Sequence, residues 1–301
     1  IHFRGFKSEK SGIYQVCQKT GAKWIDFMKD QTDISLGSRK IKIASAAKEA
    51  DIIISLPKLK THQLTYFTGA VKNSLGLVPG FVKTKQHAIH PDRDSFSAFL
   101  IDLNIAVAPG FYLMDGIMGM EGEGPGQGTP VNTGVLIGST NPLAVDITAC
   151  KIVDYDPMIV PTNSIALSRG VWLKEEKDIE YDGPPLESLI MKNFKRIAHA
   201  SNGNVVVRFL MHRLRSVRSL QVKPVFIHDK CIGCRECIKI CSMNALAMHP
   251  VKKNWVVLTD NKCIRCFCCS EICQSNAIQV RRNFFGYGVL KKTYSAVRRL
   301  F

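Results

Sequence analysis

Apolar and polar residues between positions 48 and 183 alternate with a period that changes from strand-like to helical and back. Residues 51–56 form a short, nearly all-apolar run before a proline, which predicts a buried strand. Residues 96–107 carry apolar side chains at helical spacing and predict a helix. Residues 111–114 and 135–137 predict further strands, and residues 142–153 predict a helix that begins with proline. Strands that alternate with helices predict an α/β layered domain.

The pattern changes near the C-terminus, where one short stretch occurs twice at an offset of 32 residues. In each copy an apolar strand-like run, 224–227 or 255–258, comes first, and a short apolar helical stretch, 245–248 or 277–280, comes last. Between them lie four cysteines with the same spacing in both copies: Cys231, Cys234, Cys237 and Cys241, then Cys263, Cys266, Cys269 and Cys273. The repeat predicts a second, smaller α+β domain.

The spacing of these cysteines indicates their chemistry. Three thiols at steps of three, followed by a fourth, suit a loop that wraps a cubane iron–sulfur cluster. Zinc takes four tetrahedral ligands, usually from two separated pairs, and fits this spacing poorly; disulfides are the other alternative. We therefore expect two 4Fe–4S clusters and a protein that transfers electrons.

Residues 225–280 resemble the bacterial-type ferredoxin with two 4Fe–4S clusters, because both cysteine motifs and the Lys-Cys and Asn-Ala pairs around them match. In that fold the fourth cysteine of each motif binds the cluster of the other motif. The resemblance implies one cluster bound by Cys231, Cys234, Cys237 and Cys273, and another bound by Cys263, Cys266, Cys269 and Cys241. Ser242 and Gln274 stand where that family usually has proline. This difference affects the turn expected there and the reduction potential expected of the clusters.

Three cysteines lie outside the two motifs. Cys268 is interpreted as a spare thiol that is packed or partly exposed, with a role as alternative ligand left open. Cys17 and Cys150 are isolated, and the apolar surroundings of Cys150 predict a buried core thiol. No disulfide framework is indicated, and eight cluster thiolates imply a reducing compartment, which we expect to be the cytoplasm of an anaerobe.

The α/β region contains five short motifs in a fixed order: SLPKLKTH at 55–62, FTGAVKN at 67–73, MDG at 114–116, MEG at 120–122 and PLAVD at 142–146. Over residues 48–183 the chain resembles the family catalogued as domain of unknown function 362, which often carries a fused ferredoxin. The strands with which that family usually begins are largely missing from residues 1–47. We therefore expect an incomplete sheet and a natural N-terminus upstream of Ile1.

Polar residues follow the strand predicted at 51–56, where open α/β sheets place their ligands. Alternate residues of an extended chain project to one side, and a threonine before glycine is typical of a helix N-cap. Lysines beside free backbone amides favour an anionic substrate, and the family resemblance strengthens this interpretation. The candidate substrate-binding residues are Lys58, Lys60, Thr61, Thr68, Lys72 and Asn73, with His62 among them as a candidate catalytic residue. The alternative is a set of solvated loop lysines and a capping threonine.

Asp115 follows the strand predicted at 111–114, and a glycine-rich stretch with Glu121 comes next. We expect residues 116–134 to form a loop that closes over the ligand, with Asp115 and Glu121 as further candidate catalytic groups for proton transfer. An ordinary flexible connection is the alternative. Asp146 is either a hydrogen-bonded carboxylate that holds the fold or a site residue, and His87 and His90 are expected at the surface.

Charge bears on the partners. The chain has 41 Lys and Arg against 25 Asp and Glu, a formal charge of +16, and residues 188–224 and 281–301 contain basic but no acidic residues. Residues 281–301 predict a basic amphipathic helix that packs onto its own domain or docks to an anionic membrane or acidic protein. Ordinary counter-ions are the alternative, and nucleic acid is disfavoured. No uninterrupted apolar run is long enough to predict a transmembrane helix, and no nucleotide-binding glycine motif occurs.

Four segments are predicted: an α/β domain at 1–187, a basic connection at 188–224, the ferredoxin-like domain at 225–280 and a basic tail at 281–301. The favoured hypothesis is an iron–sulfur oxidoreductase whose clusters exchange electrons with an anionic substrate or cofactor in the α/β domain. An electron carrier without chemistry of its own, which docks to an acidic redox partner, is one alternative. A metal- or cofactor-handling protein is the other, so that enzymatic activity stays open.

Overall fold

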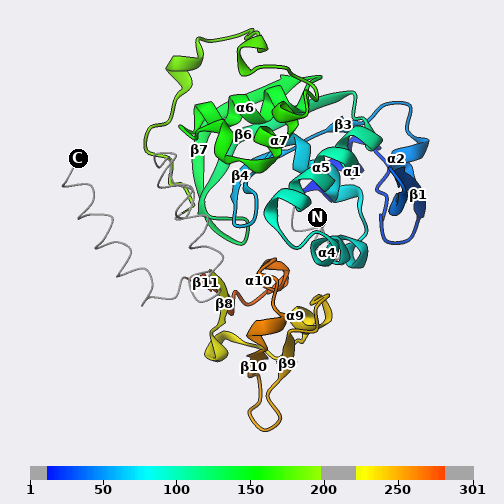
Figure 1. The fold of residues 1–301 in the computed structure, drawn as a ribbon, viewed down its shortest axis with the longest axis vertical. Helices are drawn as coiled ribbons and strands as arrows, with labels where there is room; N and C mark the ends of the chain where they lie inside the picture. Colours follow the sequence, from blue (N-terminus) through cyan, green and yellow to red (C-terminus); the bar gives the residue numbers. More distant parts are fainter. Residues whose placement is uncertain (1–11, 198–221, 282–301) are drawn as a thin grey trace, which may run out of the picture. The chain divides into compact units, whose positions relative to one another are not determined.

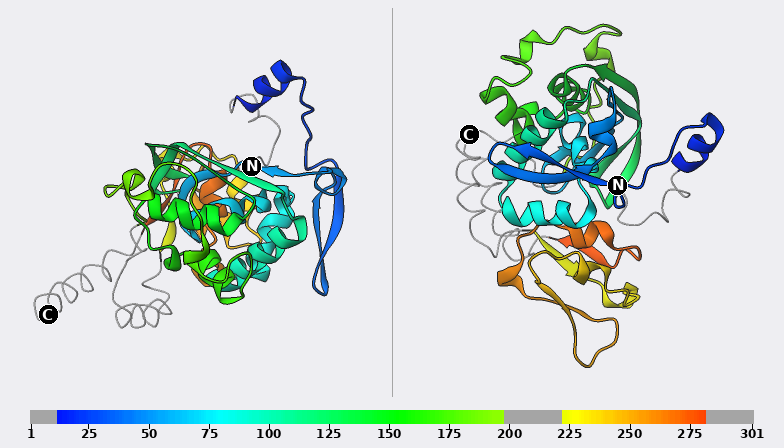
Figure 2. Two further views of the ribbon diagram at one scale, coloured as in Figure 1. Left: turned by 90° about the horizontal axis from the view of Figure 1, so that it is seen from above. Right: turned by 90° about the vertical axis from the view of Figure 1, so that its right-hand side faces the viewer.

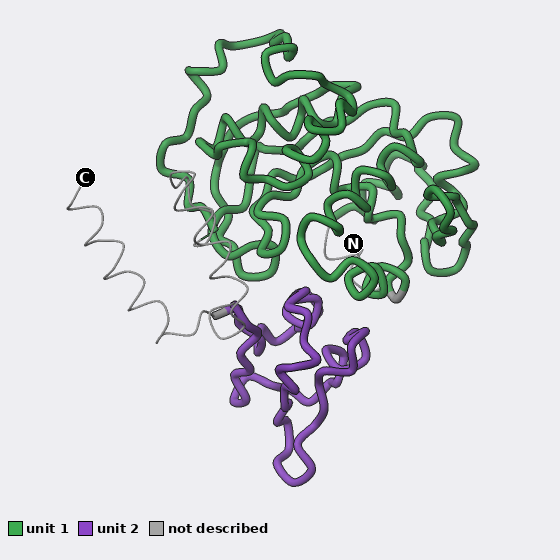
Figure 3. The backbone as a smooth tube through the Cα atoms, in the orientation of Figure 1, with its two compact units in different colours: residues 1–197 green, residues 198–301 purple. Residues whose placement is uncertain are grey.

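The computed structural model describes residues 12–197 and 222–281. The chain divides into two compact units, residues 1–197 (unit 1) and residues 198–301 (unit 2) (Figure 3). Unit 1 combines a mixed sheet with helices, and the described part of unit 2 contains short strands and short helices (Figure 1). The predicted fold class, α/β followed by a small α+β region, is confirmed. The basic tail at 281–301 falls almost entirely outside the described residues.

A five-stranded mixed sheet forms the centre of unit 1. Its central strand β6 pairs in parallel with β3 and β4 and antiparallel with β7, whereas β5 is antiparallel to β4. The parallel pairing is possible because helix α5 (Arg93–Val107) separates β5 from β6 in the sequence and returns the chain. The strands are β3 (Ile54–Ser55), β4 (Lys58–His62), β5 (Tyr66–Thr68), β6 (Phe111–Glu123) and β7 (Gln127–Ser139).

Helices α5, α6 (Pro142–Ile152) and α7 (Pro161–Ser168) lie over one face of this sheet (Figure 1). Apolar side chains of α5, including Phe96, Leu100 and Leu103, are fully buried in the main core, as their helical spacing predicts. The side chain of Asn141 accepts hydrogen bonds from the backbone N–H groups of Leu143 and Ala144 and so caps α6. The helices predicted at 96–107 and 142–153 are therefore present.

The other elements of unit 1 lie around this core. Strands β1 (Gln31–Leu36) and β2 (Arg39–Ala44) form an antiparallel hairpin at its margin (Figure 2, blue). Ile41 and Ile43 of β2 are buried in the main core. The other α-helices among the described residues of unit 1 are α1 (Ile13–Thr20), α2 (Ala46–Glu49), α3 (Ala70–Asn73) and α4 (Gly80–Ile89).

The prediction of a buried strand at 51–56 is wrong in its burial. β3 is only two residues long, and Ile52, Ile54 and Leu56 are 64%, 58% and 67% exposed. The strand register pairs Ile54 with Phe111, and Ser55, which is buried, with Tyr112, which is also buried. Ser55 therefore shares the buried face of the sheet, and Ile54 points to the opposite face. The nearly all-apolar run predicted a strand buried on both faces of the sheet, but at β3 only one face of the sheet is covered.

The glycine-rich stretch at 116–134 is not a loop over a ligand. It forms most of the long hairpin of β6 and β7, whose paired residues run from Tyr112 and Ser139 to Glu123 and Gln127. A Cβ atom on Gly119 would lie 3.1 Å from Leu59 Cδ2 in the neighbouring strand β4, which is a tight contact. The glycines thus permit close packing of strands, a use that composition alone does not distinguish from a flexible loop.

The described residues of unit 2 form two antiparallel strand pairs and two short α-helices. β8 (Lys223–Phe226) pairs with β11 (Ile278–Arg281), and β9 (Leu246–Met248) pairs with β10 (Val256–Leu258). Helices α9 (Glu236–Lys239) and α10 (Cys268–Ile272) occupy equivalent places in the two repeats. The helices predicted at 245–248 and 277–280 are wrong, because these short apolar runs are β9 and β11 and their length did not distinguish the two structures.

Among the described residues, no helix is both long and apolar enough to cross a membrane.

Candidate functional site

Two cavities in unit 2 are lined by cysteines from both motifs. Around the first lie Cys231, Cys234, Cys237 and Cys273. Around the second lie Cys241, Cys263, Cys266 and Cys269, with Cys268 as a fifth thiol. Each cavity thus receives three cysteines from one motif and the fourth cysteine of the other. This is the grouping that the ferredoxin resemblance implied.

The local backbone explains how the two motifs wrap these cavities. A residue in the left-handed conformation, Arg235 or Phe267, precedes the short helix of each motif, with φ of 61° and 62°. After the fourth cysteine the chain turns, and a backbone N–H donates back to its sulfur. Ala245 N–H lies 3.3 Å from Cys241 Sγ, and Ala277 N–H lies 3.2 Å from Cys273 Sγ. The repeat in sequence is therefore also a repeat in backbone geometry.

Some of the thiols around the two cavities are disfavoured as isolated anions. Burial, together with the charges of the neighbouring thiols Cys234, Cys231 and Cys273, raises the pKa of Cys237 to about 11. Burial likewise raises the pKa of Cys269, and the charges of Cys266 and Cys263 act in the same direction. Thiolates crowded in an apolar cavity need a compensating cation, which the iron of a cluster supplies when it binds. The donor set and the cavities fit 4Fe–4S clusters.

Cys268 is buried beside the second cavity. Its side chain is hydrogen-bonded to that of Cys266, and this hydrogen bond lowers the pKa of the Cys266 thiol. The same bond raises the pKa of Cys268, so that Cys268 is the partner that keeps its proton. Cys150 is fully buried on α6, as predicted, and burial raises its pKa.

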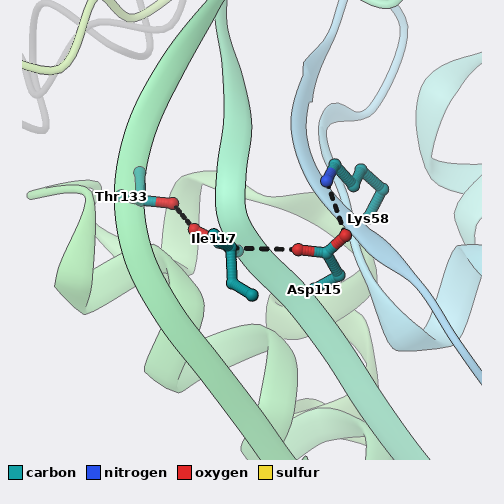
Figure 4. Close-up of polar contacts among 5 residues, drawn as sticks. Lys58, Asp115, Ile117 and Thr133 are labelled. Carbon is teal, nitrogen blue, oxygen red and sulfur yellow. Dashed lines mark hydrogen bonds and ion pairs between the residues drawn. The ribbon is translucent and has the colours of Figure 1, made fainter.

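In unit 1, Lys58 and Asp115 form an ion pair across β4 and β6 (Figure 4). The distance from Lys58 Nζ to Asp115 Oδ2 is 2.6 Å, and the two side chains are 43% and 47% exposed. The hydrogen bond from Lys58 lowers the pKa of Asp115. Asp115 Oδ1 also accepts the backbone N–H of Ile117 at 3.0 Å, where a bulge shifts the register of β6. Both side chains have partners within the fold.

Burial increases along β4 from the exposed Lys58, through the half-buried Lys60, to the buried His62. The His62 ring accepts hydrogen bonds at Nδ1 from the backbone N–H groups of Leu64 at 3.1 Å and Thr65 at 3.4 Å. His62 thereby closes the turn that joins β4 to β5. With Nδ1 acting as acceptor, a neutral His62 carries its proton on Nε2.

The predicted N-cap at Thr68 is wrong, since α3 begins at Ala70 and no side chain of its own segment caps it. Asp146 of α6 takes this role: its carboxylate accepts the backbone N–H groups of Ala70 and of Val71, the latter at 3.2 Å. A Cβ atom on Gly69 would overlap this carboxylate, which explains the glycine. Of the two alternatives for Asp146, the structure supports the residue that holds the fold.

Burial raises the pKa of Asp146 to about 7, although the two backbone donors act in the opposite direction. Thr61 and Thr68 are buried, and within the described residues neither hydroxyl has a hydrogen-bond partner. Lys72 is half-buried on α3, and Asn73 Nδ2 donates to Ser55 Oγ at 2.9 Å. The candidate substrate-binding residues therefore differ widely in environment.

Glu121 is buried and ties β6 to a distant segment. Its carboxylate accepts the backbone N–H of Lys195 at 2.8 Å and lies 3.4 Å from Lys195 Nζ. The backbone N–H of Gly122 donates to Lys195 O at 2.7 Å, which completes this connection. No spacing in the sequence indicated the partnership, because 74 residues separate Glu121 from Lys195.

The two histidines expected at the surface are held by aromatic stacking. His87 is buried, with its ring centroid 4.2 Å from that of Phe96, and His90 stacks on Phe99 at 5.0 Å. The surface prediction is wrong for His87. The two histidine rings stack on Phe96 and Phe99, which lie one turn apart on α5. The sequence of residues 80–90 alone does not predict these partners.

The regions of the chain that match known protein families fall separately in unit 1 and in unit 2. Residues 6–151 match the sequence profile of the domain of unknown function DUF362, and residues 230–281 match that of the 4Fe–4S dicluster domain. The thylakoid-associated protein sll1697 of Synechocystis sp. is 37% identical over 123 residues, which is 40% of this chain and 38% of that protein. The alignment thus spans well under half of this relative. No solved structure matches the chain. One region of the chain thus matches the DUF362 family and another matches the 4Fe–4S dicluster domain, and the second match supports an iron–sulfur electron-transfer role.

Proposed function

We propose that the chain binds two 4Fe–4S clusters and uses them to exchange electrons with an anionic substrate or cofactor bound by unit 1. The observation that carries the first part is the pair of cysteine-lined cavities, each with four thiols drawn from both motifs. One cluster is held by Cys231, Cys234, Cys237 and Cys273, and the other by Cys241, Cys263, Cys266 and Cys269. When bound, the clusters supply one-electron redox chemistry.

Lys60 and Lys72 are the residues that we assign to the anion, with Thr61, Thr68 and Asn73 as polar neighbours in sequence. His62 holds a proton at Nε2 for a proton-coupled step, because its Nδ1 accepts backbone donors. Lys58, Asp115 and Glu121 act through the contacts described above and position β4 and β6. Their partners within the fold favour a supporting role over direct proton transfer.

An electron carrier without chemistry of its own is the second candidate. The observation in its favour is that Asp115, Glu121 and Asp146 all have partners within the fold. In this version the basic surface of the chain docks to an acidic redox protein or to an anionic membrane surface, and nucleic acid is not a partner. The relative is named as thylakoid-associated. For this chain we propose a reducing compartment, such as the cytoplasm of an anaerobe, because eight cluster thiolates need one.

Iron and sulfide analysis of anaerobically prepared protein tests the cluster assignment. Two cubane clusters correspond to about eight irons and about eight sulfides per chain. Cys234→Ala should reduce both contents to about half, since it removes a ligand of one cluster only. Cys268→Ala is the matched control and should leave them unchanged. Zinc without sulfide in the unmodified protein would contradict the proposal.

Turnover separates the two candidate functions. Chain reduced by dithionite is screened anaerobically against carboxylate and phosphate compounds, and mass spectrometry identifies any compound that copurifies. If the chain is an oxidoreductase, Lys60→Ala should weaken the binding of the compound identified in this screen. The expected loss of binding free energy is about 1.5–3 kcal/mol, the scale of a charge-assisted hydrogen bond, while the cluster spectra stay unchanged. Absence of both turnover and ligand, with normal clusters, favours the carrier.

A further inference from the structure

The two cysteine motifs share their spacing but differ in their exposure to solvent. Ile232 is 63% exposed, whereas Ile264, its equivalent 32 positions later, is partly buried. Cys234 is exposed, whereas the equivalent Cys266 is partly buried. A ligand at the surface shortens the distance between its cluster and an outside partner. The first motif therefore offers the more accessible cluster site.

The cavities of the two motifs differ in the same way. The residue after the second cysteine is Arg235 in the first motif, where it is exposed and lines the cavity. Its equivalent in the second motif is Phe267, which is buried. His228 and Glu236 also line the first cavity. Among the described residues, those that line the second cavity are, apart from its cysteines, Ser242 and apolar side chains. Charged side chains that can meet a partner thus lie at the first site.

The turn between β9 and β10 packs on the first motif. A Cβ atom on Gly233 would overlap the side-chain oxygen of Asn254, so the glycine leaves room for this turn. The ring of Trp255 stacks on that of His228, which lines the first cavity, with the ring centroids 3.6 Å apart. Lys252 Nζ in turn lies 4.4 Å from the centroid of the Trp255 ring. These contacts bring Lys252 to the first site.

Basic residues outnumber acidic ones around the first site. Residues 228–239 include three Lys and Arg and two Asp and Glu, and the turn at 249–255 adds two lysines and no acid. The equivalent residues of the second motif, 260–271, include two of each kind. One of the acids at the first site, Glu236, forms an ion pair with Lys239 at 3.2 Å. A positive surface beside an exposed cluster ligand complements a negatively charged partner.

The same surface also carries exposed apolar side chains. Val251, in the turn, is 84% exposed, and Ile232 belongs to the first motif. Exposed apolar side chains bordered by charged ones are typical of a surface that meets a partner. An anionic membrane would match the charge, but its headgroups supply no electron. A small acidic electron-transfer protein matches the charge, the apolar side chains and the exposed cluster ligand together.

We propose that a small acidic electron-transfer protein docks on this surface and exchanges electrons with the chain through the first cluster, which Cys234 helps to hold. The inference rests on the proposed function, which supplies the clusters. When the partner is the donor, its redox group loses one electron and the first cluster gains that electron. The docking surface is formed by exposed residues of the first motif and of the turn: Lys230, Ile232, Arg235, Val251 and Lys252.

Anaerobic stopped-flow mixing with a reduced acidic flavodoxin, chosen to have a lower potential than the clusters, tests this. Electron transfer to the unmodified chain should slow as salt rises. Lys230→Glu should slow it about fivefold at low salt, and the difference should disappear at high salt. The matched control is Lys262→Glu, because Lys262 is also exposed and has the same position in the second motif. It makes the same change in net charge and should keep the rate of the unmodified chain.

Iron content and reduction potentials are measured in every variant, so that a change in docking is distinguished from a change in the clusters. If Lys230→Glu does not assemble both clusters, Lys252→Glu replaces it, with the same expected effect and control. With both clusters present, equal rates in Lys230→Glu and Lys262→Glu, or no electron transfer to the unmodified chain, overturn the inference alone. An unmodified chain without iron and sulfide overturns the proposed function instead.

Sedimentation with phosphatidylglycerol vesicles tests the membrane as the alternative partner. If the docking surface serves an acidic protein, Lys230→Glu and Lys262→Glu should bind these vesicles alike. Weaker vesicle binding by Lys230→Glu, with its rate of electron transfer from flavodoxin unchanged, overturns the protein partner in favour of an anionic membrane surface.

Discussion

In unit 2 the residues marked by the sequence come together around two cavities, whereas in unit 1 most of them are tied into the fold. The eight motif cysteines line two sites. In unit 1, by contrast, Asp146 caps α3, Glu121 holds Lys195 and Asp115 pairs with Lys58. Polar residues in a motif can thus serve the scaffold as readily as the chemistry.

The difference has a physical origin. A thiol is a weak hydrogen-bonding group, so a cluster of buried thiols has little structural use without a metal. Carboxylates, amides and hydroxyls satisfy backbone donors well and are therefore recruited into folds. Cysteine spacing consequently predicts function more directly than a motif of lysines and acids does. This contrast between the two units fails if any residue of unit 1 that has a partner within the fold also acts on a ligand. Substitutions in unit 1 test this.

The largest expected effect is that of Asp146→Ala. It leaves two buried N–H groups at the start of α3 without an acceptor, and we expect unit 1 to lose about 2–4 kcal/mol of unfolding free energy. Hydrogen exchange with mass spectrometry on the full chain, across a urea series, measures this in peptides of α3 and α6. Asp156→Ala is the matched control, because Asp156 caps only the short turn at Met158 and should cost less. Equal losses in both variants would argue against the capping role.

The pH dependence of unit 1 should also trace to Asp146. The pKa of Asp146 is about 7 in the folded chain and near 3.8 in the unfolded chain. At pH values between these two, the folded state binds a proton that the unfolded state has released. Stability is then greatest at low pH and falls as pH rises, by about 2 kcal/mol between pH 5 and pH 7. Hydrogen exchange at fixed urea, corrected for intrinsic rates, follows this change. Asp146→Asn, which cannot ionise, should flatten the profile, and a slope that persists there would assign it to another group.

How far the sequence predicts this molecule can be judged from particular residues. The helices over 96–107 and 142–153 and the grouping of the eight cysteines follow from periodicity, spacing and the ferredoxin resemblance, all of which are local or repeated signals. Asp146 capping Ala70, and Glu121 holding Lys195, join residues more than 70 positions apart. No local pattern encodes such partners. Gly119 and the exposed Ile54 were misinterpreted for the same reason: what matters is the neighbour across the sheet.

A smaller effect is expected for Thr61→Val. Thr61 is fully buried and its hydroxyl has no partner among the described residues, so replacing it with a methyl group should be neutral or stabilise unit 1 by up to about 1 kcal/mol. Thr65→Val is the matched control. Thr65 is equally buried, but its Oγ1 donates to Phe67 O at 2.8 Å, and its loss should cost about 1 kcal/mol. Destabilisation by Thr61→Val would show that its hydroxyl has a structural partner and weaken its assignment to a ligand.

The smallest effect is expected for Lys58→Met, because both members of its ion pair are nearly half exposed. Such pairs contribute about 0–1 kcal/mol, and salt screens them, so the change should be within about 0.5 kcal/mol and vanish in high salt. The pKa of Asp115 is lowered in the folded state, so the contribution of the pair is present near neutral pH and is lost as pH falls through that pKa. Lys42→Met, which removes the 3.4 Å pair with Asp33, is the control of similar exposure.

Isothermal titration with phosphate tests whether Lys58 supports the fold or binds an anion. If Lys58 only supports the sheet, Lys58→Met and Lys42→Met bind phosphate alike. A selective loss of phosphate binding in Lys58→Met would return this lysine to the candidate anion site.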